Sequence, residues 1–325
     1  MPQKILPCCF FPTEVLLVDD DQTFLDTLAY TLESKGIKTS TFINPNDALQ
    51  AVKQQDTLDL TKLYSTSVDV ADNSSVYETK TDLSGIAKYA FNKNGTRPVS
   101  VIVSDYHMLP INGLTFLSQV HSPDIKKILL TAVASDDTAV RAFNDGTIDT
   151  FISKSEQHLA DKIFAAIQNL QFTLFAEQSL AVYRLYDNVA NSKPFLQNKA
   201  FLSWFKSFIT DHNINAFYLV TEFGMLDFIL LKNDDNEHQV SWLSLRDDSD
   251  MFALLDLARS HGSTISILAR LENCSAIPMV TNKEDAECPP DQWHTIMRPT
   301  HGIPIEDMKV FYSYVENVDW RCLAR

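Results

Sequence analysis

Side chains of three chemical kinds stand directly after short apolar segments in the first half of the sequence: carboxylates, a hydroxyl and an amine. In chain order they are Asp19, Asp20, Asp105, Thr131 and Lys154. Two adjacent aspartates facing a third would raise one another's pKa unless a cation lay between them. An all-oxygen site that leaves room for water suits Mg2+. The pattern therefore predicts a magnesium site built from Asp19, Asp20 and Asp105.

The same set suits phosphoryl transfer. A magnesium ion and the ammonium of Lys154 would neutralise an incoming phosphoryl group from two sides, and the hydroxyl of Thr131 can donate a hydrogen bond to one of its oxygens. Asp105 stands alone at the end of the strand expected at the centre of the sheet, so it is the best-placed nucleophile. Asp21 is either a neighbour of the metal or a solvated loop residue. The alternative is a domain that kept acidic strand ends without activity.

The segments that carry these residues alternate with stretches of helical periodicity. Strands are expected at residues 14–18, 39–43, 99–103, 128–130 and 150–153. Helices are expected at about 24–35, 45–54, 83–91, 114–120 and 136–144. Strands and helices in alternation indicate a parallel, doubly wound sheet with right-handed crossovers. Ligands bind such sheets at the carboxyl ends of the strands, where all of the polar residues above fall.

The sequence predicts an α/β domain over residues 1–157, with a polar loop insertion at about 56–81, and then a connecting helix over 158–191. The apolar stripe of that helix continues beyond Leu170, so it must pack on the following domain or on a second chain. A homodimer that forms on phosphorylation would satisfy it. Residues 192–325 show no regular alternation and are expected to form an α+β domain. Its strands are expected at 216–221, 226–231, 240–245, 264–268 and 309–315, and its helices at 196–211 and 249–261.

The charge balance is acidic, with 27 Lys and Arg against 42 Asp and Glu and a net charge of -15. Such a chain repels nucleic-acid phosphates and anionic membranes. The five cysteines are odd in number and match no zinc spacing, so reduced thiols in a cytoplasmic protein are expected. No signal peptide or membrane-spanning segment is evident, so membrane insertion is not expected.

At these polar positions the sequence resembles the receiver domain of two-component response regulators, from about Glu14 to Leu170. The resemblance rests on VLLVDDD (15–21), VIVSDYHM (101–108), ILLTA (128–132) and AFNDGTIDTFISK (142–154). It implies a flavodoxin-like fold with five parallel strands, and Asp105 as the phosphoacceptor. It also implies that Mg2+ is held by Asp19, Asp20, Asp105 and the main-chain carbonyl of His107. Thr131, Lys154 and Phe151 take the places of the switch hydroxyl, the phosphate-pairing lysine and the switch aromatic.

The sequence departs from the family's pattern in three places, one of which is an unusually long stretch between the second helix and the third strand. Leu109 replaces the usual proline four residues after the acceptor, with Pro110 next, although Gly113 keeps its spacing. Lys154-Ser155 replaces the usual Lys-Pro. Over its whole length the chain also resembles the quorum-sensing response regulators of Legionella (the Lqs system). That resemblance implies a partner sensor histidine kinase that responds to a small diffusible signal.

The second domain carries no motif that identifies its activity. A nucleic-acid or nucleotide-binding output, an enzymatic output and a protein-binding output remain open, and no catalytic set supports the enzyme. Two candidate cation sites each have a more ordinary interpretation, as polar loops or turn acids. The first comprises Cys288, Asp291, His294, His301 and Glu306, and the second comprises the pairs Asp234-Asp235 and Asp247-Asp248.

Overall fold

The chain is described by a computed structural model. The described residues are 5–54, 58–64, 69–71, 74–76, 97–132, 137–185, 193–222, 225–233, 238–281, 285 and 288–318. The chain divides into two compact units. We call residues 12–59 and 94–177 the parallel-sheet unit, and residues 1–11, 60–93 and 178–325 the antiparallel-sheet unit.

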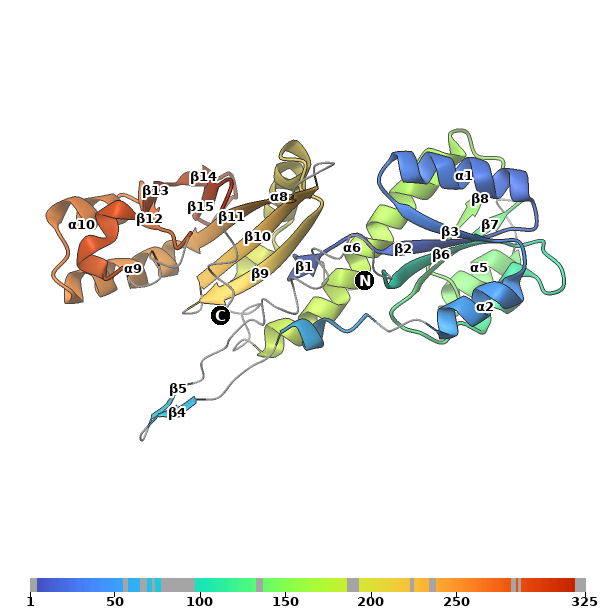
Figure 1. Ribbon diagram of the computed structural model, residues 1–325, viewed down its shortest axis with the longest axis horizontal. Coiled ribbons are helices and arrows are strands. Elements are labelled where there is room, and N and C mark those ends of the chain that lie inside the picture. Colours follow the sequence, from blue (N-terminus) through green and yellow to red (C-terminus); the bar gives the residue numbers. More distant parts are fainter. Residues whose placement is uncertain are drawn as a thin grey trace. The chain divides into compact units, whose positions relative to one another are not determined.

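The parallel-sheet unit is built on one five-stranded sheet (Figure 1). Its strands are β2 (Glu14–Val18), β3 (Lys38–Phe42), β6 (Val99–Asp105), β7 (Lys126–Thr131) and β8 (Thr150–Ser153). They lie in the order β3-β2-β6-β7-β8, and every neighbouring pair is parallel. This is the flavodoxin-like order, so the predicted fold of this unit is confirmed. All residues of β6, the central strand, are buried.

Helices cover both faces of this sheet. α1 (Gln22–Ser34) and the first part of α6 (Leu159–Leu185) pack on one face, against alternate residues of β2, β6 and β7. α2 (Pro45–Lys53), α4 (Gly113–Ser118) and α5 (Asp137–Asn144) pack on the other. Because successive strand residues point to opposite faces, each of the three central strands supplies apolar side chains to both cores.

The antiparallel-sheet unit contains a six-stranded sheet in the order β1-β9-β10-β11-β15-β14. Its strands are β1 (Cys9–Phe10), β9 (Ala216–Glu222), β10 (Met225–Asn233), β11 (His238–Asp247), β14 (His301–Ile303) and β15 (Val310–Val315). α8 (Lys199–Asp211) packs an aromatic stripe on one face of the sheet. The ring of Phe205 lies 5.1 Å from that of Phe217 and 5.6 Å from that of Phe228. Helices and antiparallel strands follow the parallel-sheet unit as an α+β arrangement, as expected.

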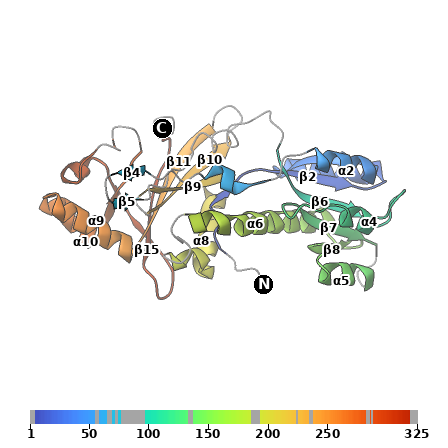
Figure 2. The same ribbon diagram turned by 90° about the horizontal axis from the view of Figure 1, so that it is seen from below.

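The remaining described elements of this unit are short, apart from α9 (Asp248–Ser260). They are η1 (Leu60–Leu63), β4 (Asp69–Ala71), β5 (Ser74–Val76), η2 (Pro194–Gln197), α10 (Ile265–Glu272), β12 (Ala276–Pro278), η3 (Pro290–Thr295) and β13 (Met297–Pro299). α9 and α10 lie side by side (Figure 2).

The strand expected at residues 264–268 is wrong, because these residues begin α10. The isoleucine-rich segment fits a strand or a short buried helix equally well by periodicity. The side chain of Thr264 accepts a hydrogen bond from the amide of Ile267 (3.4 Å), which caps a helix. The helix ends before Cys274, whose φ of 52° lies in the left-handed region.

Two segments of the expected first domain, residues 1–11 and the described residues between 60 and 76, belong to the antiparallel-sheet unit. β1 joins the antiparallel sheet, with Cys9 opposite Tyr218, although residues 1–157 were expected to form one domain. Within the expected insertion at 56–81, the described residues include η1 and the β4–β5 hairpin. The helix expected at 83–91 lies outside the described residues.

The long helix is continuous from Leu159 to Leu185 and contributes to both units. Its apolar stripe beyond Leu170 is buried within a single chain: Phe175 is 0% exposed and Tyr183 is 1% exposed. The Tyr183 hydroxyl donates to the main-chain oxygen of Leu6 (2.9 Å). The stripe therefore needs no second chain, and this reason for expecting a homodimer is removed. Within the described residues, no helix combines the length and apolar character needed to cross a bilayer.

Candidate functional site

Three carboxylates meet at the carboxyl edge of the parallel sheet. Asp19 and Asp20 directly follow β2, and Asp105 is the last residue of the neighbouring strand β6. One oxygen of each lies within 4.8 Å of the others. Asp19 and Asp105 are buried, with side chains 2% and 7% exposed, whereas Asp20 is exposed. The cluster is therefore open to solvent on one side.

Lys154 reaches this cluster from the end of β8. Its ammonium lies 2.7 Å from Oδ2 of Asp19 and 2.8 Å from Oδ1 of Asp105. The same ammonium stands 4.7 Å from the centre of the Phe24 ring, which is a cation–π contact. The main-chain amide of Lys154 donates to the carbonyl of Thr131 (2.7 Å), which ties the end of β8 to the end of β7.

Burial and pairing set the protonation of these groups. Burial raises the pKa of Asp19, and it outweighs the hydrogen bonds from Lys154 and the amide of Asp21, which lower it. Burial alone would lower the pKa of Lys154, but hydrogen bonds to Asp105 and Asp19 reverse this and raise it. Lys154 therefore stays protonated, and the site holds a fixed cation facing an excess of carboxylates.

The loops around the cluster are shaped by short polar contacts. The carboxylate of Asp21 accepts hydrogen bonds from the amides of Thr23 (2.9 Å) and Phe24 (3.1 Å), so it caps α1. The amide of His107 donates to Oδ2 of Asp105 (3.1 Å). Both oxygens of Asp105 therefore have partners, one from Lys154 and one from its own loop.

The loop after Asp105 is pressed against the end of β6. A Cβ added at Gly113 would lie 1.8 Å from the main-chain oxygen of Asp105, so only glycine fits here. The spacing of Gly113 from the acceptor is thus a requirement of packing. The Leu109-Pro110 peptide in this loop is cis, and it is the only cis bond among the described residues, so Lys154-Ser155 is trans.

Thr131 and Phe151 lie on β7 and β8, the two strands that follow β6 in the order of the sheet. Thr131 ends β7, which pairs with β6, and is 1% exposed. Phe151 lies on β8 and packs, half-buried, against the core on the side of α2, α4 and α5. The structure thus brings together the side chains of Asp19, Asp20, Asp105 and Lys154. It places Thr131 at the end of β7, the strand next to β6, while Phe151 packs against the core. His107 is at the rim, and its carbonyl as a metal ligand stays a prediction.

Two contacts of the site were not predicted from the sequence. Phe24 lies in the helix expected at about 24–35, and nothing in its spacing shows that a lysine 130 residues later covers its ring. The capping role of Asp21 was detectable, because an aspartate directly before a helical periodicity is a typical N-cap.

The donor set fits a magnesium ion. Three carboxylates can supply hard oxygen ligands from one side, and the exposed position of Asp20 leaves room for water. Asp19, Asp20 and Asp105 form the only group of three potential ligands that converges in the described part of the chain. The residues between Cys288 and Glu306 do not gather into a site. Asp247 caps α9, while Asp234 and Asp235 lie outside the described residues.

No protein-family model and no curated protein matches this sequence. Among solved structures, that of the Legionella pneumophila response regulator LqsR is similar to 95% of this chain and 89% of its own, with 28% identity and a TM-score of 0.76. A CheY-like receiver domain protein from Methanospirillum hungatei matches 51% of this chain and 98% of its own, with 18% identity and a TM-score of 0.35. A Francisella response regulator receiver domain matches 49% and 96%, with 18% identity and a TM-score of 0.33. The similarity to LqsR confirms the whole-chain resemblance to Legionella response regulators.

Proposed function

We propose that this chain is a response regulator that accepts a phosphoryl group from a sensor histidine kinase on Asp105, in quorum-sensing signalling. One observation carries the proposal. The carboxylate of Asp105 ends the central strand within 4.8 Å of Asp19 and Asp20 oxygens, and an ammonium lies 2.8 Å from its Oδ1. A nucleophilic carboxylate, a metal-binding acid pair and a fixed cation are the groups that phosphoryl transfer to an acid requires.

In the proposed reaction a carboxylate oxygen of Asp105 attacks the phosphorus of a phosphohistidine. A P–O bond forms, the P–N bond breaks, and the imidazole leaves with the electron pair. Lys154 holds Asp105 in place and neutralises the transferred group, and the Thr131 hydroxyl donates to one of its oxygens. Asp19, Asp20, Asp105 and the His107 carbonyl would hold Mg2+, which supplies the remaining positive charge. Because the Asp105 side chain is only 7% exposed, the phosphohistidine can approach it only from the solvent-facing side of the site.

Labelling of the full chain with a small phosphodonor and Mg2+ tests this assignment. We expect one acid-labile phosphoryl group per chain and none in Asp105→Asn. In Asp20→Asn we expect reduced labelling that needs a higher Mg2+ concentration, because the site has lost one metal ligand. Asp21→Asn is the matched control, because asparagine keeps the helix cap and Asp21 lies outside the ligand set. Labelling that persists in Asp105→Asn, or that falls equally in Asp21→Asn and Asp20→Asn, would contradict the site.

We also propose that phosphorylation promotes self-association through the face formed by α5, β8 and α6. Two observations support this face. Val140 and Phe143, one helical turn apart on α5, are 41% and 49% exposed, so they place two exposed apolar side chains next to each other. Phe151 on the adjacent strand β8 is only half-buried, so movement of its ring upon phosphorylation would change this surface.

Analytical ultracentrifugation with and without phosphodonor tests the second step. We expect the mass to rise with labelling, and to rise less in Phe143→Ser, which removes apolar area without touching the phosphoacceptor. Phe151→Ala should blunt the rise and leave labelling intact. Equal masses in both states at every concentration would reject phosphorylation-linked self-association.

A further inference from the structure

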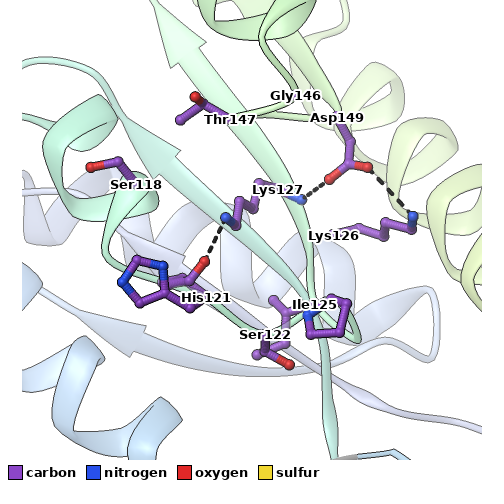
Figure 3. Close-up of a pocket in the computed structure, with 11 residues that line it drawn as sticks. Ser118, His121, Ser122, Ile125, Lys126, Lys127, Gly146, Thr147 and Asp149 are labelled. Atoms are coloured by element: carbon purple, nitrogen blue, oxygen red, sulfur yellow. Dashed lines mark hydrogen bonds and ion pairs between the residues drawn. The ribbon is translucent and has the colours of Figure 1, made fainter.

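A hollow lies at the other end of the parallel sheet from the carboxylate cluster. It is formed by residues 118–127, which lead from α4 into β7, and residues 146–149, which lead from α5 into β8 (Figure 3). These are the amino ends of β7 and β8, whereas Asp105, Thr131 and Lys154 belong to the carboxyl ends. The hollow has a volume of about 360 Å³, which is within the range of small-molecule sites.

The ammonium of Lys127 is the central charged group of this hollow. It donates to the main-chain carbonyl of Val120 (2.6 Å), on the side where Ser118 and His121 also lie (Figure 3). Burial lowers the pKa of Lys127, and the attraction of Asp149 only partly opposes this. No carboxylate of the described residues is paired with this ammonium. An ammonium has three donors, so two remain for another partner.

The neighbouring charges are already paired with one another. The carboxylate of Asp149 accepts from the main-chain amide of Lys127 (2.8 Å) and lies 3.5 Å from the ammonium of Lys126. Lys126 also pairs with Glu177 (2.8 Å). The lining therefore holds two cations and one anion, in a protein whose net charge is -15. Its charge is opposite in sign to that of the chain as a whole.

We propose that this hollow binds a small molecule through an oxyanion, either a phosphate or a carboxylate group. Lys127 would donate charge-assisted hydrogen bonds to the anion, which are the strong kind. The lining hydroxyls of Ser122 and Thr147 and the exposed imidazole of His121 would complete its contacts. Anion binding would also relieve the cost of a half-buried ammonium bonded only to a carbonyl.

Nuclear magnetic resonance on the full chain tests the proposal, with inorganic phosphate and acetate as separate probes. The titrations run at constant ionic strength with a chelator present, so that metal-dependent binding at Asp105 does not contribute. We expect saturable shifts of the amides of residues 118–127 and 146–149. The probe that saturates at the lower concentration identifies the class of oxyanion.

Variants separate a site from a general effect of salt. Lys127→Gln should weaken binding at least about tenfold, because one charge-assisted hydrogen bond contributes that much. Lys53→Gln removes an equal charge from the exposed end of α2 and should leave binding unchanged. Linear shifts that do not saturate, or saturable binding retained in Lys127→Gln, would overturn the proposal. If Lys127→Gln does not fold, unchanged affinity in His121→Gln overturns it, since His121 is exposed.

Discussion

Replacing Lys154 by methionine removes the cation that, among the described residues, pairs with the carboxylate cluster. Methionine keeps most of the length and the apolar stem of lysine, so the contact with Phe24 is largely preserved. What is lost is the ammonium, 2.7 Å from Asp19 and 2.8 Å from Asp105. Both carboxylates then remain more than nine-tenths buried and repel each other with no compensating charge.

The cost follows from the two lost hydrogen bonds. Each hydrogen bond to a charged group contributes about 1.5–3 kcal/mol, and removing one partner of a fully buried ion pair costs about 3–5 kcal/mol. Because the Lys154 side chain is 28% exposed, solvent screens part of this. We expect a loss of about 2–4 kcal/mol in the free energy of unfolding without Mg2+. Saturating Mg2+ should reduce the loss below about 1 kcal/mol, because a second cation replaces the first.

Hydrogen exchange of amides in β2 and β6 is the suitable measurement. Tryptophan fluorescence would report the wrong unit, since the tryptophans in the described part of the chain, Trp204, Trp242 and Trp293, belong to the antiparallel-sheet unit. A loss of about 2–4 kcal/mol should speed exchange through unfolding by roughly 30- to 700-fold.

Lys162→Met is the matched control. Lys162 pairs with Glu156 on the surface, where the two side chains are 50% and 40% exposed, so the change should be about 1 kcal/mol or less. Wild-type exchange rates in Lys154→Met without Mg2+, or an increase that Mg2+ does not reverse, would refute the reasoning.

Three further predictions concern the same edge of the sheet. Gly113→Ala should destabilise the parallel-sheet unit by about 3 kcal/mol or more, because its Cβ would lie 1.8 Å from the Asp105 oxygen; denaturation followed by circular dichroism checks this. Asp21→Ala should cost about 0.5–2 kcal/mol by removing the α1 cap, seen as a lower urea midpoint with phosphoryl labelling retained. The pKa of Asp19 is raised in the folded state, so the protonated carboxyl stabilises the fold. This stabilisation is complete below the unfolded pKa of about 3.9, and it is lost as the pH rises through the folded pKa. Without Mg2+, stability should therefore fall over that window, and Asp19→Asn should abolish this fall.

The carboxyl edge of the parallel sheet was predictable because it depends on local signals. Each strand is a short apolar run that ends at a polar residue, and parallel strands place their carboxyl ends together. The positions of Asp19, Asp105 and Lys154 at this edge follow from that rule. The pairing of one ammonium with both buried carboxylates does not, because it depends on side-chain reach across three strands.

Other features depend on contacts that no local pattern encodes. The pairing of Cys9 with Tyr218 joins residues more than 200 positions apart. A strand of two residues is too short for its sequence pattern to indicate which strand it pairs with. The periodicity of the segment beginning at Ile265 fits a strand and a helix equally well. The N-cap hydrogen bond of Thr264 favours the helix. The oxyanion hollow was missed because Lys127 lies at the start of one strand and Thr147 lies in the loop before the next, and no motif links the two positions.

The place of β1 has a consequence for biosynthesis and for protein dissection. A ribosome makes Cys9 and Phe10 long before β9, the strand with which they pair. These two residues therefore remain unpaired until the parallel-sheet unit and β9 have been synthesised. A fragment that starts at residue 192 would leave β9 as an uncovered edge, and uncovered edges recruit foreign strands and aggregate. It would also lack the Leu6 oxygen and the Tyr183 hydroxyl that bond to each other. Studies of the carboxyl-terminal half in isolation should therefore supply residues 5–11 in trans or by circular permutation.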